Sequence, residues 1–337
     1  MQTRNKKVII GTRGSMLAMW QANWIKADLQ SRYHEIDVEL KKIKTTGDKI
    51  LDVPLAKVGG KGLFVKEIEE AMLRNEIDLA VHSMKDVPAV LPADLHLGAV
   101  CIREDPRDAL ISKVRDSKFE IRNFKDLPQG ATVGTSSLRR MCQLLSARPD
   151  LNIVQLRGNL DTRIRKLDEG QFDAIIVAAA GVKRLGMAER ITEILNPDIS
   201  VPAIGQGAVG IECRIHDEFI NDLIKPLNHL ETEICVRAER AFNKKLEGGC
   251  QVPLAAYAQL KYRDDSEEIR KKQGCDMSSD PCDLVIDGLV GSLKGDRIIR
   301  SSIKGHPEDA EKLGTDLAED LLSQGAKEIL AEIFNEQ

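Results

Sequence analysis

The sequence contains one local pattern twice: a short apolar run, a turn rich in glycine, threonine and serine, and an amphipathic run that starts directly after a serine. The first copy is Val8–Ile10 followed by the turn Gly11-Thr12-Arg13-Gly14-Ser15. The second is Val133, the turn Gly134–Ser137 and the run Leu138–Met141. Each copy predicts a buried strand, a tight turn and a serine-capped helix. Two such units favour an α/β fold built on two sheets.

The composition is that of a globular protein with several domains. At 337 residues the chain exceeds what one core usually organises, so we expect two or three domains. Charged residues make up 30%, which is typical of a soluble protein. The longest apolar stretch, 174–182, is too short to span a membrane, and Gly11 breaks the first apolar run, so no signal peptide is expected. We therefore predict a cytoplasmic protein that has no membrane segment.

Cysteine usage and net charge argue against several kinds of partner. The seven cysteines lack paired spacing and fit free thiols in a reducing compartment. Because there is no Cys-x-x-Cys pair and no His-Glu-x-x-His motif, no metal site is expected. A net charge of −4 and 4% aromatic residues argue against nucleic-acid binding. An anionic ligand would therefore need locally clustered cations.

One predicted strand ends in a loop of titratable residues. The strand 78–81 runs into His82–Pro88, which contains Ser83, Lys85 and Asp86. Ligands of open α/β sheets bind outside the carboxyl ends of the strands, where this loop is expected to lie. An ion pair between Lys85 and Asp86 on a solvated loop is the structural alternative.

Several predicted strand-to-helix turns carry basic residues. Arg13 and Ser15 lie where free backbone N–H groups favour an anion, although a plain cap beside a solvated arginine would also explain them. Arg139 and Arg140 lie in the first turn of a helix, where cations oppose the macrodipole and so indicate an anionic partner. The other junctions contain Arg157-Gly158-Asn159 with Arg163, and Gly181-Val182-Lys183-Arg184. Together these turns predict a cleft lined by fixed positive charge.

Two glycine-rich segments complete the candidate site. Val58–Phe64, preceded by Lys57, contains three glycines around Lys61 and predicts a mobile loop that closes over a ligand. This loop is not a P-loop, because no Ser or Thr follows its Gly-Lys pair. Gly248-Gly249 ends a predicted helix, so Cys250 should lie on the turn beyond and present its thiol to a cleft. A helix cap followed by a small buried cysteine is the alternative.

The order of the elements predicts two crossings between two domains, followed by a third, smaller domain. The segment 202–208 has the composition of a hinge, after which the strand 209–213 rejoins the first domain. The predicted domains are 1–103 with 204–226, then 104–203, then 227–337. In the third we expect a hairpin over 284–303 that turns at Gly295, and a helical tail over 307–334 that breaks at Gly325.

Motifs spread over nearly the whole chain resemble one known family. They are Gly11-Thr12-Arg13-x-Ser15, Val58-Gly59-Gly60-Lys61-Gly62-Leu63-Phe64, His82-Ser83-Met84-Lys85-Asp86-Val87-Pro88, Gly134-Thr135-Ser136-Ser137-Leu138-Arg139-Arg140, Gly205-Gln206-Gly207 and Glu247-Gly248-Gly249-Cys250. In this order they are similar to the hydroxymethylbilane synthase family, also called porphobilinogen deaminase. The resemblance implies two periplasmic-binding-protein-like domains of type II, with mixed sheets and a double crossover, plus a small C-terminal α+β domain.

The resemblance also implies an activity and its residues. It implies a monomeric transferase of tetrapyrrole and haem biosynthesis that holds a dipyrromethane cofactor covalently on Cys250. Four molecules of the substrate porphobilinogen are joined head to tail with loss of ammonia, and 1-hydroxymethylbilane is released by hydrolysis. Asp86 is implied as the catalytic residue. The further implied residues are Ser83, Lys85, Asp86, Ser137, Arg139, Arg140, Arg157 and Gly158 for the cofactor, Arg13, Ser15, Arg157, Arg163 and Arg184 for the substrate, and Lys57, Lys61 and Phe64 on the lid.

The segment 261–283 departs from the family pattern. It is a charged insert that contains Cys275 and Cys282, and its polarity predicts a surface loop. The separation of these cysteines matches no common metal site. The role of His82 stays open, because it could serve only to brace the loop. The alternative function for the whole chain is a non-catalytic clamshell receptor for a small anion, which the same fold would permit.

Overall fold

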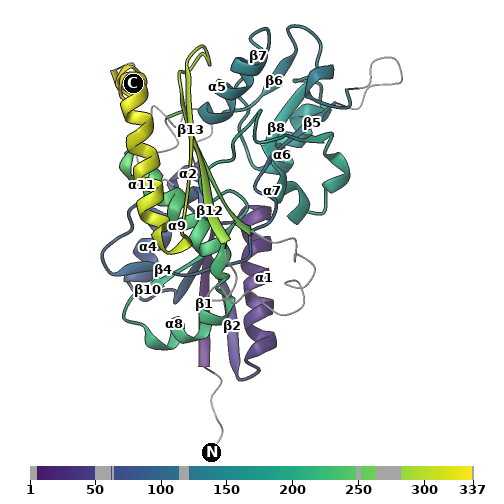
Figure 1. Cartoon of the computed structure of the whole chain (residues 1–337). Coiled ribbons are helices and arrows are strands. Elements are labelled where there is room, and N and C mark those ends of the chain that lie inside the picture. The colour runs from purple at the N-terminus through teal and green to yellow at the C-terminus, as the bar shows by residue number, and fades with distance from the viewer. Residues whose placement is uncertain are drawn as a thin grey trace, which may run out of the picture.

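The computed structural model describes residues 6–49, 62, 64–113, 121–247, 252–262 and 282–335. Within them the chain forms two five-stranded mixed sheets and one three-stranded antiparallel sheet. In Figure 1 the first sheet lies at the bottom and the second at the upper right, whereas the third lies beside the C-terminal helices.

The first sheet has the strand order β2-β1-β3-β10-β4. Its strands are β1 (Lys6–Thr12), β2 (Ile36–Lys42), β3 (Leu79–Ser83), β4 (Leu95–Val100) and β10 (Val209–Arg214). β1 pairs in parallel with β2 and β3, whereas β10 runs antiparallel between β3 and β4. The helices of this part are α1 (Met16–Arg32), α2 (Thr46–Lys49), α4 (Lys66–Leu73) and α8 (Glu218–Ile224).

The second sheet has the order β7-β6-β8-β5-β9. Its strands are β5 (Asp108–Ser112), β6 (Thr132–Gly134), β7 (Asn152–Val154), β8 (Ala174–Ala178) and β9 (Glu193–Ile194), and its helices are α5 (Leu138–Ala147), α6 (Leu160–Asp168) and α7 (Ala179–Arg184). β6 is parallel to β7 and β8, whereas β5 is antiparallel to β8. The chain passes between the two sheets in two crossing segments, the outgoing segment 101–107 before β5 and the returning segment 195–208 before β10. The strand after each crossing segment takes the fourth place in its sheet and runs antiparallel to its neighbours. This arrangement confirms the predicted α/β class with mixed sheets and a double crossover.

The third sheet is the antiparallel meander β11-β12-β13. Its elements are β11 (Leu254–Tyr262), β12 (Cys282–Gly291), β13 (Ile298–Gly305), α9 (Leu230–Lys245), α11 (Ala310–Leu321) and α12 (Lys327–Asn335). Gly295, with φ of 70°, turns the hairpin, and Gly325, with φ of 106°, breaks the helical tail, as predicted. The remaining short helical turns are η1 (Met84–Asp86), η2 (Phe124–Asp126), η3 (Ala188–Arg190), η4 (Lys225–Leu227), η5 (Pro307–Asp309) and η6 (Leu322–Ala326).

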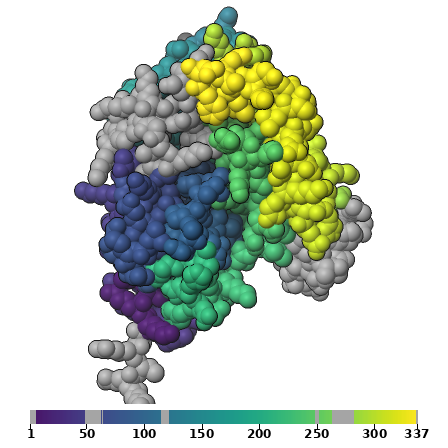
Figure 2. Space-filling view, turned by 90° about the vertical axis from the view of Figure 1, so that its left-hand side faces the viewer, coloured from purple at the N-terminus to yellow at the C-terminus, as the bar shows by residue number. Residues whose placement is uncertain are grey.

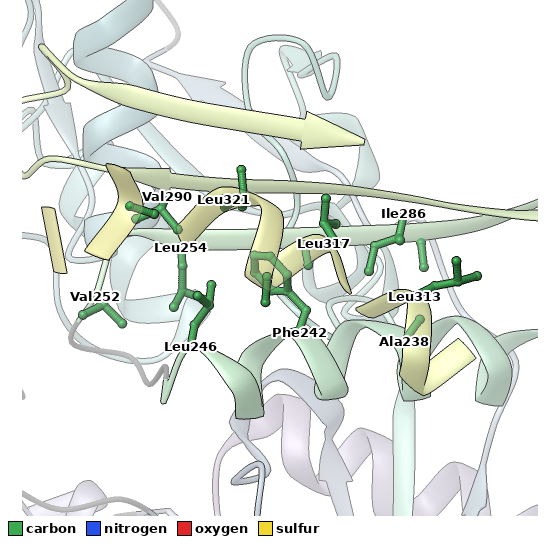
Figure 3. Packing of buried hydrophobic residues seen from close by; sticks show 14 of the residues in the cluster. Ala238, Phe242, Leu246, Val252, Leu254, Ile286, Val290, Leu313, Leu317 and Leu321 are labelled. Carbon is green, nitrogen blue, oxygen red and sulfur yellow. The ribbon is translucent and has the colours of Figure 1, made fainter. Parts of the chain in front are cut away.

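Close helix packing builds the core of this third part. The yellow C-terminal helices lie against the green segment that contains α9 (Figure 2). Phe242 of α9 is fully buried between α11 and the sheet, beside Leu317 and Ile286 (Figure 3). A Cβ at Gly314 of α11 would lie 2.1 Å from the carbonyl oxygen of Ala238 on α9. Only glycine therefore allows the backbones of the two helices to approach this closely.

Asp108, at the start of β5, fastens both crossing segments to α5. Its buried carboxylate accepts hydrogen bonds from Arg139 Nη1 at 2.8 Å and from Arg140 Nε at 3.0 Å. It also accepts from Ser200 Oγ at 2.7 Å and from Gln206 Nε2 at 2.9 Å, both on the returning segment. Burial alone would raise the pKa of this carboxyl, but the two guanidinium charges outweigh it and hold the pKa well below its usual range.

Glu239 of α9 ties the same crossing segments to the third sheet. Its buried carboxylate accepts hydrogen bonds from Arg103 Nη1 at 2.6 Å on the outgoing segment and from the backbone N–H of Gly205 at 2.6 Å on the returning segment. It accepts a further bond from the N–H of Ala258 in β11 at 2.9 Å. One carboxylate therefore joins both crossings to the third sheet.

We expect Asp108→Asn to lower the free energy of unfolding by about 3 to 5 kcal/mol, because it leaves two buried guanidinium groups without their countercharge. Denaturant unfolding of the purified variant measures this change. The matched control is Asp168→Asn, whose carboxylate accepts a hydrogen bond from Arg190 Nη1 at 3.2 Å at the surface. The control should change stability by about 1 kcal/mol or less. Equal losses in the two variants would contradict the role assigned to Asp108.

Candidate functional site

Asp86 lies on a short turn that buried residues hold in place. β3 runs directly into η1, and the Met84 side chain in this turn is 1% exposed. Gly205 of the returning segment has φ of 67°, and a Cβ there would lie 2.8 Å from the Cβ of Met84. The backbone of the turn is therefore clamped from behind, while the Asp86 side chain stays half-buried and within reach of solvent.

Cations from the second sheet's helices and turns face this carboxylate. The Lys85 side chain is exposed, but the protein around its ammonium group removes part of its hydration, and this is the main cause that lowers its pKa. Arg140 and Arg163 lower the pKa of Lys85 further, whereas Asp86 raises it. Burial also lowers the pKa of Arg163 to about 10, and Arg140 and Arg157 add to this effect while Asp86 opposes it. Asp86 and these cations therefore interact electrostatically across the two sheets.

Several positively charged side chains lie close together in this site. Burial and mutual repulsion both disfavour the charged forms of Lys85 and Arg163, and Asp86 offsets only part of this. A ligand that carries several carboxylates would relieve the repulsion and would gain charge-assisted hydrogen bonds. The arrangement is therefore suited to binding a polyanion next to a single carboxylate.

The anionic partner that the sequence predicts for Arg139 and Arg140 is, in the structure, the protein's own Asp108. Arg139 donates to both carboxylate oxygens and also to the carbonyl oxygen of Val201 at 2.5 Å. Arg140 Nη1 donates to the carbonyl oxygen of Ile176 at 3.0 Å. Both arginines are buried and organise the second sheet's domain, and their contact with a cofactor stays a prediction.

The serines predicted for the site make hydrogen bonds within the protein. Ser15 Oγ accepts from the backbone N–H three residues on at 3.3 Å and caps α1, and Ser137 Oγ caps α5 in the same way at 3.4 Å. Ser83, at the end of β3, accepts from Gln21 Nε2 at 2.9 Å. The predicted caps are confirmed, whereas ligand contacts of these hydroxyl groups stay predictions.

Two of the predicted substrate-binding arginines lie over aromatic rings. The Arg13 guanidinium lies 4.3 Å from the centroid of the Phe64 ring, and that of Arg184 lies 5.7 Å from the Trp20 ring. Arg184 Nη2 also donates to the carbonyl oxygen of Gly207 at 2.7 Å. Arg184 lies in the last turn of α7 rather than in a loop, because the buried Val182 and its neighbours continue the helix.

The turn before α6 brings two further predicted residues together. Arg163 Nε donates to the carbonyl oxygen of Gly158 at 2.8 Å, and Gly158 has φ of 111°. A side chain at Gly158 would meet Thr162, so glycine is required by both its backbone angle and its surroundings. Arg157 lies half-buried beside this turn.

Some predicted residues lie outside the described residues: Lys57, Lys61, Gly248, Gly249, Cys250 and Cys275. α9 ends at Lys245, before the glycines that were predicted to stop it, and Glu247 already has the left-handed φ of 52°. Cys282 is buried in β12 opposite Tyr262, so the hairpin strands extend into both ends of the predicted insert. The described residues contain no group of three His, Cys, Asp or Glu side chains that could hold a metal ion, and none of their helices is long and apolar enough to span a membrane.

Sequence analysis missed a buried acidic cluster behind the Asp86 turn. His82 Nε2 lies 2.9 Å from Glu212 Oε2, and both side chains are buried. Glu69 of α4 lies close by, and Oε1 of Glu69 and Oε1 of Glu212 have no hydrogen-bond partner among the described residues. Burial and the charge of Glu212 raise the pKa of Glu69 to about 7, with His82 opposing them. The sequence signal was Glu212 itself, a single acid within the apolar strand 209–213.

The double crossover between two mixed sheets defines a class of α/β proteins with a binding-protein-like strand order. Residues 8–222 match the family model described as porphobilinogen deaminase, dipyromethane cofactor binding domain, and residues 233–323 match the one described as porphobilinogen deaminase, C-terminal domain. The chain belongs to the porphobilinogen deaminase family.

Similar proteins cover nearly the whole chain. A porphobilinogen deaminase of Geobacter metallireducens is 55% identical over 332 residues, 98% of this chain and 96% of the relative. One of Pelobacter propionicus is 51% identical over 98% of this chain and 99% of its own. The family membership supports an enzyme of tetrapyrrole synthesis, and not the alternative of a non-catalytic anion receptor.

Two solved structures of binding proteins share a distant likeness with this chain. The probable amino-acid transporter binding protein ytmK of Bacillus subtilis is 13% identical over 66% of this chain and 90% of its own, with a TM-score of 0.39. The aliphatic sulphonate binding protein SsuA of Escherichia coli is 15% identical over 72% of this chain and 71% of its own, with a TM-score of 0.38. The fold class follows from the strand order of the two mixed sheets.

We expect Glu69→Gln to change how stability depends on pH. The folded-state pKa of about 7 lies above the ordinary value of 4.5, so the stability that the neutral carboxyl contributes is full below pH 4.5 and is lost as the pH rises through 7. The variant should lack this loss and exceed the unchanged chain above pH 7 by about 1 to 3 kcal/mol. Denaturant unfolding at pH 5 and pH 8 measures the difference, with Glu70→Gln on the exposed face of α4 as the control. The prediction is wrong if Glu69→Gln and Glu70→Gln lose equal stability between the two pH values.

Proposed function

We propose that this chain is a hydroxymethylbilane synthase. It joins four porphobilinogen molecules head to tail on a covalently held dipyrromethane, with loss of ammonia, and releases 1-hydroxymethylbilane by hydrolysis. Family membership supplies the reaction. The observation that supports the assignment of residues is the turn that holds Lys85 and Asp86 against Gly205, with the charges of Arg140 and Arg163 acting on Lys85 from the second sheet.

The charge of the site fits the dipyrromethane cofactor. This group carries acetate and propionate side chains, and the crowded cations around Asp86 are stabilised by such carboxylates. When bound, the cofactor supplies the pyrrole carbon to which the first substrate is joined. The residues proposed to hold it are Cys250 through a thioether, and Ser83, Lys85, Asp86, Ser137, Arg139, Arg140, Arg157 and Gly158 through polar contacts.

Asp86 is proposed to act on the substrate. Loss of ammonia from porphobilinogen leaves an electrophilic cation, and the newly joined ring must then lose a proton. A carboxylate held beside the reacting atoms can stabilise the cation and accept the proton. A pair of unit charges at about 4 Å and an effective dielectric of about 20 is worth about 4 kcal/mol, or roughly a thousandfold in rate if it acts only in the transition state. The clamped turn supports this role because it keeps the carboxylate in place.

The basic residues are proposed to neutralise the growing product. Each added ring brings two more carboxylates, so the negative charge in the site increases with every step. Arg13, Ser15, Arg157, Arg163 and Arg184 are proposed to bind the substrate, with Lys57, Lys61 and Phe64 on the lid. The stacking of Arg13 on Phe64 supports the link between lid and substrate site, because it joins the first basic turn to the residue that ends the lid motif.

The remaining assignments follow the family resemblance. We propose a monomeric, cytoplasmic transferase with domains at 1–103 with 204–226, at 104–203 and at 227–337. The positions of β5 and β10 support these bounds, because each of these strands follows a crossing segment and pairs within a different sheet.

The intact mass of the purified chain under denaturing conditions tests the function directly. We expect a mass above that of the bare sequence by one dipyrromethane, and we expect this increment to disappear in Cys250→Ala, because the thioether can form only at that sulfur. The control is Cys213→Ala, since this thiol is buried and its pKa is raised to about 12 by burial, which leaves it unreactive. A bare mass in the unchanged chain would refute the proposal.

The role of Asp86 can be separated from cofactor attachment. We expect Asp86→Ala to keep the covalent cofactor but to lose turnover by roughly a hundredfold to a thousandfold, because only the step that develops positive charge needs the carboxylate. Steady-state turnover with porphobilinogen, measured beside the intact mass, checks both parts. Asp94→Ala, at an exposed position before β4, should keep normal turnover. Normal turnover in Asp86→Ala would remove the assigned role.

A further inference from the structure

Arg240 of α9 reaches across to the chain segment that follows Asp86. Its Nη2 donates to the carbonyl oxygens of Pro88 at 2.7 Å and Ala89 at 3.2 Å, and its Nη1 donates to that of Val87 at 3.4 Å. One guanidinium group thus holds three successive carbonyl groups directly after the turn. The planar fork of arginine provides several donors in a fixed geometry, which a lysine does not.

The helix that carries Arg240 is a firm base for this contact. Glu239, its neighbour, is bonded to both crossing segments, and Phe242, two residues further on, is fully buried in the core of the third sheet. Val236, one turn before Arg240, belongs to the same buried apolar cluster as Met84 and Val87 of the Asp86 turn. The segment after Asp86 is therefore bonded to a helix that its own buried contacts hold in place.

A groove opens beside Arg240. Its volume is about 890 Å³, and it is lined by Ala89 and Leu97 on one side and by Arg237 and Lys244 of α9 on the other. Figure 2 shows the green segment that contains α9 between the blue residues near 100 and the yellow C-terminal helices. Val236 lines the groove together with Arg240, so the apolar cluster and the contact made by Arg240 lie side by side at this junction.

Burial disfavours the charged form of Arg240. Burial lowers its pKa, and Glu212 is the acidic group that opposes this. Its hydrogen bonds to Val87, Pro88 and Ala89 go to neutral carbonyl groups, which compensate a buried cation less well than a carboxylate does. An apolar side chain would fill the same place without this penalty, so the bonds to residues 87–89 are the feature that requires arginine here.

We propose that Arg240 is a positioning residue for Asp86: by fixing residues 87–89 to α9, it aims the carboxylate at the cation-lined site. The inference rests on the proposed function, which assigns the chemical step to Asp86. Arg240 acts through the backbone and does not itself touch the reacting atoms. A misplacement of about 1 Å in a reacting group lowers rates by about a hundredfold, whereas substrate binding by the separate arginines is retained.

Arg240→Ala tests this against the matched control Arg237→Ala. Arg237 lies one turn earlier on α9, lines the same groove, and its Nε pairs with Glu311 at 2.7 Å at the surface. We expect Arg240→Ala to lower kcat by roughly 10- to 100-fold with KM changed by less than about threefold, and Arg237→Ala to stay within about twofold in both. A kcat of Arg240→Ala equal to that of the control would overturn the proposal.

Chemical rescue separates positioning from a merely structural loss. Because the groove opens beside residue 240, methylguanidinium should enter the space left in Arg240→Ala and restore kcat in a saturable way, with no effect on Arg237→Ala. If Arg240→Ala does not fold, Arg240→Lys decides: a folded Arg240→Lys should show a reduced kcat and an unchanged KM, because an ammonium group cannot hold three carbonyl oxygens at once. A normal kcat in Arg240→Lys, or a folded Arg240→Ala that methylguanidinium does not restore, would overturn the inference.

Different measurements would refute the proposed function and the positioning role of Arg240. A chain without the covalent increment in mass, or without turnover, refutes the proposed function before any variant at residue 240 is compared. An unchanged chain that carries the increment and turns over, together with an Arg240→Ala variant that matches Arg237→Ala, refutes only the positioning role. In Arg240→Ala the increment itself should be retained, because attachment at the sulfur does not depend on where the carboxylate points.

Discussion

Two buried carboxylates hold the segments on which the rest of the architecture depends. The chain crosses from the first sheet to the second and returns. Glu239 accepts hydrogen bonds from both passages, whereas Asp108, at the end of the outgoing passage, accepts them from the returning passage and from α5. A carboxylate removed from water is stable only when cations and N–H groups surround it, which makes each of these contacts costly to lose. The relative placement of the three sheets therefore depends on a few charge-assisted bonds as well as on apolar packing.

The same network explains why the cation-lined site can exist. Arg140 is bonded to Asp108 on one side and interacts with Lys85 and Arg163 on the other. Asp108 balances the charge of Arg140, and Arg140 still lowers the pKa values of Lys85 and Arg163. The neighbouring cations repel one another and are partly dehydrated, and a ligand with several carboxylates relieves both effects. Under the proposed function, Arg140 would combine a structural role with a ligand-binding role.

Local features of this fold were predictable because they depend on neighbours in the chain. Ser15 and Ser137 cap helices as their positions before amphipathic runs require, and Gly295 and Gly325 adopt left-handed angles where a turn and a break were predicted. The partner of Arg139 and Arg140 was not predictable in the same way. Asp108 is far away in the sequence, and an arginine at a helix start gives the same pattern whether its anion is a ligand or a distant carboxylate.

The sequence by itself determined the α/β class, the positions of the turns and the motifs that identify the family, because backbone angles, capping and apolar periodicity act over a few residues. Tertiary structure alone decided which charges meet. It placed the Glu69, His82 and Glu212 cluster behind the Asp86 turn, and it brought Arg240 onto the carbonyl groups after Asp86. The physical reason is that burial and Coulomb interaction depend on distance in space, which crossing segments change without leaving a local mark in the sequence.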